Sequence, residues 1–286
     1  MNILIPKEWK IAHITSIFEH SERKNCDNYR AISVTSTFSR LFGRIVRDLI
    51  ETEYSDKEAE EQAGFRAVRS CNDNTFVLKH FIEKQLSVGK EVHLLFIDLK
   101  KAFDNIPLTK LWKALEETRI IYTLIETVKE PYSFTDIKQG GLLSEGFEVM
   151  KGLRQGCCIS STLFKICVEK ALNIWKRHCS GMGYNVDNTM IYTLQFADDQ
   201  VVMAQSKEDL ECMCRKLQEE YSKWGLIVNI VKTKCMSLGT DTNHLELDNG
   251  DIITGCTEYT YLGSNLGTWD PYLPKTEETL DIYATG

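Results

Sequence analysis

The sequence predicts an α+β fold in which helices pack on an antiparallel β-sheet. Three observations lead to this prediction. Two apolar runs flank the pair Asp198 and Asp199, a pattern typical of a β-hairpin. A third apolar run ends at Asp98, and amphipathic helical segments lie before, between and after these strands. We therefore expect three acids on neighbouring strands of one sheet.

The hairpin is predicted from apolar, β-branched and aromatic residues at 190–196 and 201–204, with Asp198, Asp199 and Gln200 as its turn. Acidic residues favour turns, so two charges exposed to solvent are the simpler interpretation. However, a rigid pair of carboxylates also suits Mg²⁺, which binds a few carboxylates together with phosphate oxygens. The pair is therefore a candidate metal site.

Residues 92–97 form a near-continuous apolar run, typical of a strand buried on both faces, and the run ends at Asp98. One interpretation is that Asp98 caps a helix that begins near Leu99. The other is metal binding, since a carboxylate at the end of a buried strand is costly unless it is paired or binds a cation. Together, Asp98 and Asp198 are expected to bridge two metal ions about 3.5–4 Å apart.

The remaining elements follow from apolar periodicity. Helices are predicted at 36–60, 72–88, 110–129, 160–171 and 208–224, a β-hairpin at 134–150, and strands at 226–230 and 235–238. The residues expected to face the core are Leu41, Ile45 and Leu49; Phe76, His80 and Ile82; Leu111, Leu115 and Leu124; Leu163, Ile166, Cys167, Leu172 and Trp175; and Leu210, Met213, Leu217 and Tyr221.

With these residues in place, the chain resembles the reverse transcriptases of non-long-terminal-repeat retrotransposons, of the jockey-like insect type. The resemblance runs from about residue 9 to residue 263. Seven blocks occur in the family's order, at residues 28–33, 62–66 with 69–70, 96–104, 152–157, 196–199, 225–229 with 232–234, and 261–264. The order of all seven identifies the family more specifically than any single block.

The resemblance implies roles for individual residues. Asp98, Asp198 and Asp199 would hold the metal ions, and Lys232 would act as general acid, with Lys234 as a close alternative. Phe103, Gln155, Gly156, Arg30 and Arg66 would bind the incoming nucleotide, and Tyr261, Leu262 and Gly263 the primer end. The bulky ring of Phe103 would exclude a ribose 2′-hydroxyl, the group that distinguishes RNA from DNA precursors. An ordinary buried Phe and solvent-exposed lysines and arginines are the simpler interpretations.

The family implies polymerase fingers over residues 1–90 and a palm over 91–263, with 107–150 returning to the fingers. An antiparallel palm sheet would be backed by helices. Residues 264–286 form a divergent, acidic tail, so the thumb is expected to be largely absent, and thumb and endonuclease domains would belong to a full-length parent. The cofactor would be two Mg²⁺ ions, with Mn²⁺ as an alternative. The partners would be an RNA template, a DNA primer and deoxynucleoside triphosphates.

Three functions remain open at this point: an RNA-directed DNA polymerase domain, an inert retroelement remnant that folds or binds nucleic acid without turnover, and another two-metal enzyme such as a nucleotide cyclase. The last is disfavoured because Phe103, Gln155 and Gly156 would have no purpose there. Retention of the three acids and Lys232 favours catalysis, whereas the missing thumb favours the inert remnant.

Charge is the least polymerase-like property of the chain. The formal net charge is −7, from 34 Lys and Arg against 41 Asp and Glu. Residues 241–286 contain nine of these acids and one base, which leaves 33 bases and 32 acids in the rest. Neither part indicates a basic stripe, so nucleic-acid binding is inferred from the motifs and should be weak and salt-dependent.

The remaining composition is typical of an intracellular protein, cytoplasmic or nuclear. A chain of 286 residues can form one large or two small domains. No run of 18 apolar residues predicts a membrane span, and the first residues are too short a run for a signal peptide. The ten cysteines lack zinc-finger spacing and are expected to be free thiols in a reducing compartment.

Overall fold

A four-stranded sheet carries the three acids. The computed structural model describes residues 5–18, 22–139, 142–186, 189–240 and 244–267. Every pairing in this sheet is antiparallel, which confirms the predicted α+β class. The strand order is β11-β3-β10-β9, with bounds β11 Lys234–Leu238, β3 Val92–Ile97, β10 Asp199–Ala204 and β9 Thr193–Phe196.

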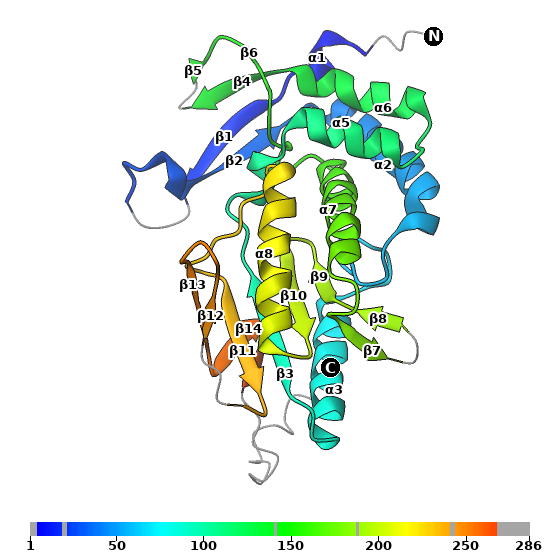
Figure 1. Cartoon of the computed structure of the whole chain (residues 1–286). Helices are drawn as coiled ribbons and strands as arrows, with labels where there is room; N and C mark the ends of the chain where they lie inside the picture. The colour runs from blue at the N-terminus through cyan, green and yellow to red at the C-terminus, as the bar shows by residue number, and fades with distance from the viewer. Residues whose placement is uncertain (1–4, 19–21, 140–141, 187–188, 241–243, 268–286) are drawn as a thin grey trace, which may run out of the picture.

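One face of this sheet is covered by two helices, as Figure 1 shows. These are α7 (Ser160–His178) and α8 (Lys207–Lys223). Because side chains alternate along a strand, Leu95 and Ile97 of β3 join the core beneath these helices. The residues predicted to face inward from α7 and α8 are all buried there, which confirms both amphipathic patterns.

The opposite face packs against α3 (Cys71–Ser87) and a hairpin of β14 (Glu258–Tyr261) and β15 (Ser264–Gly267). Leu94 and Phe96 of β3 belong to this second core. All six residues of β3 are buried, as the continuous apolar run predicts. The sheet is therefore covered on both faces, and its ends are where polar groups become accessible.

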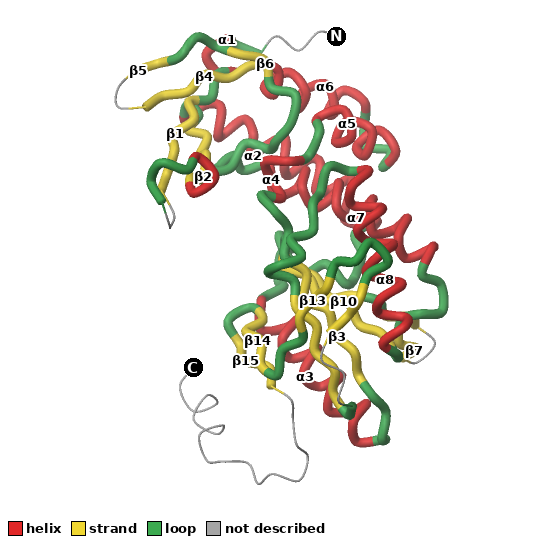
Figure 2. The backbone as a smooth tube through the Cα atoms, turned by 60° about the vertical axis from the view of Figure 1, so that its left-hand side comes forward, coloured by secondary structure: helices red, strands yellow, loops and turns green. Residues whose placement is uncertain are grey.

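A second sheet lies at the other end of the molecule (Figures 1 and 2). Its order is β2-β1-β4-β5, with β6 also paired to β4. The parallel pairing of β4 with β1 places residues from the 107–150 segment beside the N-terminal strands. The bounds are β1 His13–Phe18, β2 Tyr29–Val34, β4 Phe134–Gln139, β5 Leu142–Leu143 and β6 Phe147–Glu148. Gly140 and Gly141, inside the predicted hairpin, lie outside the described residues.

Four helices accompany this second sheet in Figure 1. They are α1 Lys7–Lys10, α2 Thr37–Tyr54, α5 Leu108–Glu117 and α6 Tyr122–Lys129. The smaller elements are α4 Ala102–Asn105, β7 Tyr184–Val186, β8 Thr189–Ile191, β12 His244–Glu246 and β13 Ile252–Thr254. Residues 268–286, most of the predicted acidic tail, lie outside the described residues.

Serine side chains begin the three longest amphipathic helices outside α7. Ser36, Ser70 and Ser206 each accept a hydrogen bond from the backbone N–H three residues later. At Ser70 the bond is reciprocal, because Asp73 accepts from the Ser70 backbone. Such bonds satisfy donors that a helix leaves free at its first turn.

The predicted helix at 110–129 is in fact two helices, α5 and α6. The break lies at residues 118–121, where Arg119 has a φ of 59°. A left-handed residue ends a helix, and glycine is its usual signal. The sequence has no glycine there, so periodicity alone runs through the break.

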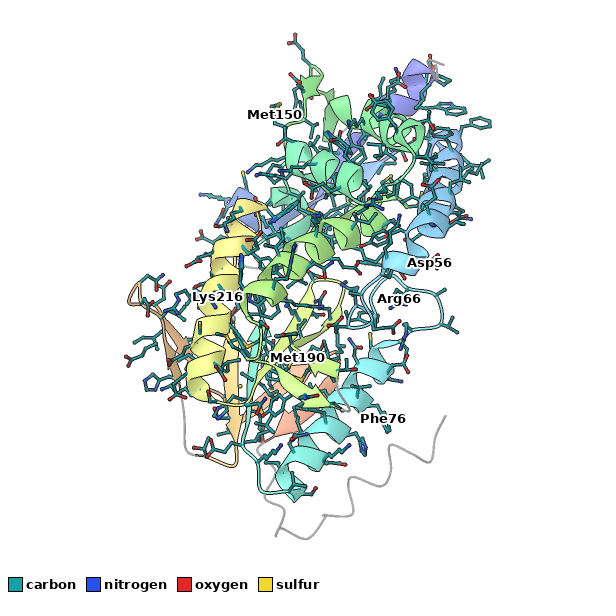
Figure 3. All side chains as sticks on the ribbon, turned by 45° about the vertical axis from the view of Figure 1, so that its right-hand side comes forward. Asp56, Arg66, Phe76, Met150, Met190 and Lys216 are labelled. Atoms are coloured by element: carbon teal, nitrogen blue, oxygen red, sulfur yellow. The ribbon has the colours of Figure 1, made fainter. Side chains whose placement is uncertain are left out.

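The predicted core faces of α2 and α3 are also wrong in part. Leu41, Ile45 and Leu49 are 57%, 54% and 49% exposed, and the buried residues of α2 are Val46, Ile50 and Tyr54. On α3, Phe76 is 67% exposed and projects outward (Figure 3), and His80 is exposed too, whereas Ile82 is buried as predicted. On α2 the structure buries a different apolar stripe from the predicted one, whereas on α3 it buries Ile82 but not Phe76 or His80.

Two strand predictions need correction. Residues 226–230 are not a strand, because only Val228 forms an isolated bridge, to Leu99. The predicted run 190–196 is divided between β8 and β9, which belong to different sheets. In the described ranges, no helix is long and apolar enough to cross a membrane. All ten cysteines lie in these ranges and are free thiols.

Candidate active site

Two of the predicted metal ligands, Asp98 and Asp198, line one cleft of about 920 Å³. Strands β3 and β10 bring them together. Gln200 pairs with Ile97 in antiparallel register, so the next position outward on each strand is Asp199 and Asp98. Acids that are 100 positions apart in sequence are thus neighbours at one end of the sheet.

A two-residue turn carries Asp198. Phe196 pairs with Asp199, so the turn consists of Ala197 and Asp198, one residue earlier than predicted. Ala197 has a φ of 60°, whereas Asp198 does not have a positive φ. A tight turn of this kind joins antiparallel strands without splaying them. It holds the Asp198 carboxylate at the cleft, between two strands of the buried sheet.

Asp98 is oriented by the segment before β11. Asn229 Nδ2 donates to Asp98 Oδ2 (3.0 Å), and the Asn229 backbone N–H donates to the Asp98 carbonyl (2.8 Å). Thr233 Oγ1 accepts from the Asp98 N–H (3.2 Å). The alternative that Asp98 caps a helix is wrong, because α4 begins only at Ala102. The Asp98 carboxylate keeps further lone pairs for another partner.

The other two acids affect the pKa of Asp199. Burial raises its pKa first, and the charges of Asp198 and Asp98 raise it further. Like charges held close together disfavour joint ionisation unless a cation compensates them. In the described part of the chain, no three His, Cys, Asp or Glu side chains meet closely enough to hold a metal ion by themselves. Asp199 also does not line the cleft.

The donor set at the cleft nevertheless fits magnesium. Mg²⁺ is a hard cation that keeps several waters and is bound by one or two carboxylates together with substrate phosphates. Asp98 and Asp198 supply two carboxylates to the lining of the cleft, and burial, followed by the charges of these two acids, raises the pKa of the neighbouring Asp199. Two protein ligands are sufficient where the substrate provides the remaining oxygens.

Phe103 forms the floor of the cleft beside the acids. It lies on α4, and its ring stacks on Phe164 of α7, with centroids 4.4 Å apart and planes 6° apart. Phe65 approaches its edge at 6.4 Å and 84°. Both Phe65 and Phe103 line the cleft. The position of the Phe103 ring is therefore fixed by aromatic packing, and a wall at this point is rigid.

Gln155 and Gly156 line the same cleft. Gln155 Nε2 donates to Asp104 Oδ1 (2.9 Å), and the Ser33 N–H of β2 donates to the Gln155 carbonyl (2.7 Å). Gly156 has a φ of 93°, and a Cβ there would lie 3.3 Å from the Ser33 carbonyl oxygen. The positive φ favours glycine, and a Cβ would fit against β2 only if its neighbours shifted slightly. This loop therefore connects β2 with α4 at the cleft.

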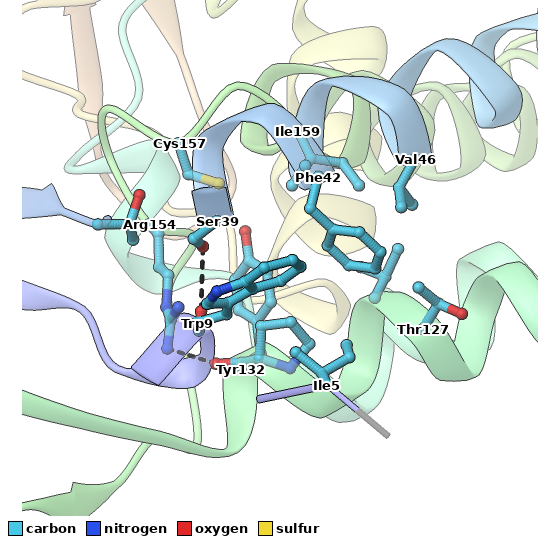
Figure 4. A pocket seen from close by; sticks show the side chains of 14 residues that line it. Ile5, Trp9, Ser39, Phe42, Val46, Thr127, Tyr132, Arg154, Cys157 and Ile159 are labelled. Carbon is cyan, nitrogen blue, oxygen red and sulfur yellow. Dashed lines mark hydrogen bonds between the residues drawn. The ribbon is translucent and has the colours of Figure 1, made fainter. Parts of the chain in front are cut away.

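Arg154 anchors the Gln155–Gly156 loop, although the sequence predicts no role for this residue. Its Nη2 donates to the carbonyl of Lys10 (2.9 Å) and to that of Pro131, and its guanidinium lies over the Tyr132 ring at 5.3 Å. Figure 4 shows Arg154 reaching into a small apolar cavity near Trp9. Arg154 is buried, so its function is to hold the loop rather than to contact a substrate.

Four bases line the cleft: Arg30, Lys100, Lys101 and Lys232. They make the cleft richer in positive charge than the net charge of the chain implies. Lys234, the alternative to Lys232, lies on β11 and does not line the cleft. Arg30 and Lys232 are both exposed, and both line the cleft.

Arg66 does not line the cleft. Its Nε is 2.9 Å from Glu58 Oε2, and its Nη1 donates to the Ala59 carbonyl (3.1 Å). Glu60 lies 3.6 Å from the same guanidinium. Arg66 lies in the loop that precedes α3, as Figure 3 shows. These partners make it part of the internal support of that loop.

The predicted primer-binding residues form the turn of the β14–β15 hairpin. Leu262 and Gly263 are its two central residues, with φ of 50° and 80°. Tyr261 is buried against the Phe96 ring at 5.9 Å, and burial raises its pKa. The hairpin packs on the sheet face opposite α7 and α8 and does not line the cleft.

Sequence reasoning missed Asn229, Lys100 and Lys101 as site residues. Asn229 belongs to the motif block at residues 225–229 without a predicted role, although it bonds to Asp98 directly. For Lys100 and Lys101 the sequence does contain a signal, because both follow Asp98 within three positions. Asn229 could not be found in this way, since its approach to Asp98 depends on how the segment before β11 packs.

Comparisons with known proteins place this geometry in a family. A family profile described as "Reverse transcriptase (RNA-dependent DNA polymerase)" matches residues 20–266. The chain is 24% identical over 237 residues to the retrovirus-related Pol polyprotein from the type-2 retrotransposable element R2DM of Drosophila melanogaster, covering 82% of the chain and 22% of that protein. It is 21% identical over 220 residues to the transposon TX1 uncharacterized 149 kDa protein of Xenopus laevis, covering 76% and 17%.

These relatives are much longer than the chain, which spans about a fifth of their length. Among solved structures, apo telomerase from Candida tropicalis, truncated from its C-terminal domain, superposes with a TM-score of 0.62 at 13% identity. That match covers 93% of the chain and 55% of the telomerase. At such identity the likeness concerns the fold. The resemblance predicted from the seven motifs is thereby confirmed.

Proposed function

Because the chain belongs to the reverse transcriptase family over residues 20–266, we propose that it is an RNA-directed DNA polymerase domain. It adds deoxynucleotides to a DNA primer on an RNA template. The observation that carries this proposal is the single cleft lined by Asp98, Asp198, Phe103, Gln155 and Lys232. These five come from four separate segments of the chain, and together they supply the functions that nucleotidyl transfer needs.

Asp98 and Asp198 would hold two Mg²⁺ ions, with Mn²⁺ as a substitute, and Asp199 would assist them from the adjoining position. Such ions activate the primer hydroxyl and neutralise charge on the attacked and leaving phosphate oxygens. The chain's own contribution is to fix the carboxylates. Asn229 orients Asp98 by its amide, and the tight turn after Phe196 orients Asp198. Ligands held in this way need little rearrangement when the substrate binds.

Lys232 is the general acid for the leaving pyrophosphate. It lines the cleft, and its backbone N–H is bonded to the Asn229 carbonyl (3.1 Å), so it belongs to the segment that orients Asp98. Proton donation by a positioned side chain contributes on the order of 10²–10⁴-fold to rate. Arg30, Lys100 and Lys101 supply further positive charge for the triphosphate and the nucleic-acid backbone.

Phe103 selects the sugar and the Gln155–Gly156 loop holds the nucleotide. The Phe103 ring is fixed by Phe164 and therefore presents a rigid wall to the 2′ position. A Cβ at Gly156 would lie 3.3 Å from the Ser33 carbonyl oxygen, so glycine lets this loop pack closely against β2. The hairpin at Leu262 would support the primer end from the far side of the sheet.

Primer extension tests the proposal. A labelled DNA primer on an RNA template is incubated with deoxynucleotides and Mg²⁺, for the wild type, Asp98→Ala and Asp198→Ala. Asp56→Ala is the matched control, because Asp56 is exposed in η2 (Ser55–Lys57), away from the cleft. Each site variant should reduce extension at least about 100-fold without loss of the folded state by circular dichroism. Extension by Asp198→Ala at the wild-type rate would overturn the metal assignment.

The same assay decides the second function, an inert remnant. The specific observation in its favour is that, in the described residues, no three metal-ligating side chains form a closed cluster. If the folded wild type does not extend the primer but binds a primed template, the inert remnant is the correct function.

A further inference from the structure

We propose that Gln62 is a positioning residue that holds the turn of Asp198 in place, an inference that rests on the proposed function of that turn. Gln62 belongs to a motif block for which the resemblance implies a role only for Arg66. It is fully buried, and it lies on the loop between α2 and α3 rather than in the sheet. Its amide contacts the turn directly.

The side-chain amide of Gln62 forms hydrogen bonds as a backbone peptide group does, because its oxygen accepts and its nitrogen donates. Oε1 accepts from the backbone N–H of Ala197 (3.2 Å) and of Gly64 (2.8 Å). Nε2 donates to Gln195 Oε1 (3.1 Å) and lies 3.5 Å from the Ala197 carbonyl oxygen. One side chain thereby bonds both backbone groups of Ala197. A buried amide with four partners is satisfied on both its atoms.

Ala197 needs such support because of its backbone. Its φ of 60° lies in the left-handed region, which residues with a Cβ rarely occupy. Strained conformations persist only where surrounding structure over-determines them, and they cluster at functional sites. Ala197 immediately precedes Asp198, so the conformation of Ala197 sets the direction of the Asp198 carboxylate.

The backbone of the loop fits the turn closely. Ala63 N–H donates to the Gln195 carbonyl, and Gln195 N–H donates to the Glu61 carbonyl, both at 2.9 Å, so the loop adds a short parallel bridge to β9. A Cβ on Gly64 would lie 2.0 Å from the Ala197 backbone nitrogen. The loop and the turn are therefore in backbone contact, and only glycine fits at that point.

The loop is itself held by α7. Lys165 pairs with Glu58, and Lys176 Nζ lies 2.7 Å from Glu61 Oε1. Arg66 pairs with the same Glu58. The two pairs with α7 hold the loop at Glu58 and Glu61, just before Gln62 in sequence, and Arg66, just after it, is tied to the same Glu58. Gln62 is thus presented from a rigid support, which a positioning residue requires.

The first test uses the wild-type protein and needs no activity. Hydrogen exchange of the Ala197 and Gly64 amides is measured by NMR against the exposed amide of Val68. We expect both bonded amides to exchange at least about 100-fold more slowly than Val68. If the Ala197 amide exchanges as fast as the Val68 amide, Gln62 does not hold the Ala197 backbone, and the proposal fails whatever the activity of the protein.

The second test measures metal binding in Gln62→Met, which keeps the side-chain volume and removes the amide. Free Mn²⁺ is followed by electron paramagnetic resonance, and stability by urea unfolding. We expect the dissociation constant for Mn²⁺ to rise by about 10- to 100-fold, as is typical when the partner of a ligand-bearing group is lost. Ser237→Ala is the control, because it removes a buried hydrogen bond to His93 at the far end of the same sheet. That control should lower stability and leave Mn²⁺ affinity unchanged.

A second-site variant separates positioning from general destabilisation. Glycine adopts a φ of 60° without strain, so Ala197→Gly in the Gln62→Met background should recover part of the lost Mn²⁺ affinity. Unchanged affinity in Gln62→Met, or an equal loss in Ser237→Ala, would overturn the proposal. If the wild type protects the Ala197 amide but does not bind Mn²⁺, the bonds from Gln62 to Ala197 are supported and the proposed catalytic function fails.

Discussion

Replacing Lys165 by methionine should strongly destabilise the protein, because Lys165 is a fully buried cation. Its Nζ lies 2.7 Å from Glu51 Oε2, it pairs with Glu58 as well, and it lies over the Tyr54 ring at 5.7 Å. Methionine keeps most of the volume but removes the charge. Both carboxylates then lose their main partner, and the side chain of Glu58 is only 9% exposed.

The magnitude follows from the partners that remain. Removing one member of a buried ion pair costs about 3–5 kcal/mol, because an uncompensated charge stays buried. Glu58 keeps Arg66 at 2.9 Å, and Glu51 keeps a bond from Thr162 Oγ1 (2.6 Å) and is partly exposed. We therefore expect the low end, a loss of about 3 kcal/mol, which corresponds to a fall in Tm of roughly 6–12 °C.

The measurement is urea unfolding followed by circular dichroism, with Lys170→Met as the matched control on the same helix. Lys170 pairs with Glu117 at 2.6 Å, but both side chains are partly exposed. Exposed pairs contribute at most about 1 kcal/mol. If Lys165→Met unfolds at the same urea concentration as the wild type, or if both variants lose equal stability, the assignment of a structural buried charge is refuted.

The remaining predictions concern the cleft and its support. Phe103→Val should admit ribonucleotides, because the rigid wall beside the 2′ position is removed. Unchanged discrimination between ribo- and deoxynucleotides in single-nucleotide extension would show that Phe103 does not select the sugar. Burial raises the pKa of Glu169 from 4.5 to about 7, so the folded state retains a proton that the unfolded state has lost. The resulting stabilisation is fully present below about pH 4.5 and is lost as the pH rises through about 7, by on the order of 3 kcal/mol. Glu169→Gln should flatten this part of the pH dependence of the unfolding free energy, and an unchanged profile would show that another group titrates.

The sequence predicts the chemistry of the cleft better than its support. Asp98 and Asp198 could be paired from sequence because each ends or follows an apolar run, and strand periodicity then places them at one sheet end. Gln62 could not be assigned a role, because its contact with Ala197 depends on a loop that crosses to β9. Loop contacts between distant segments have no periodic signal in the sequence.

The helix faces show a different limit. Leu41, Ile45 and Leu49 follow helical spacing as regularly as Val46 and Ile50, so periodicity alone cannot choose between the two stripes. The choice is made by close packing, since Gly43 lies beside the buried stripe and a Cβ there would approach Cys158 Sγ to 3.2 Å. Information of this kind is tertiary, and it appears only when α2 and the turn that contains Cys158 are both in place.

The order of the four-stranded sheet has a consequence for the thermal stability of the carboxylate site. Asp98 directly follows β3 and Asp199 begins β10, and these are the two interior strands, with β11 and β9 at the margins. Interior strands separate only when the whole domain comes apart. Heating should therefore leave the carboxylate geometry intact until global melting. Earlier losses of turnover would originate at the Gln155 loop, which a single backbone hydrogen bond connects to β2.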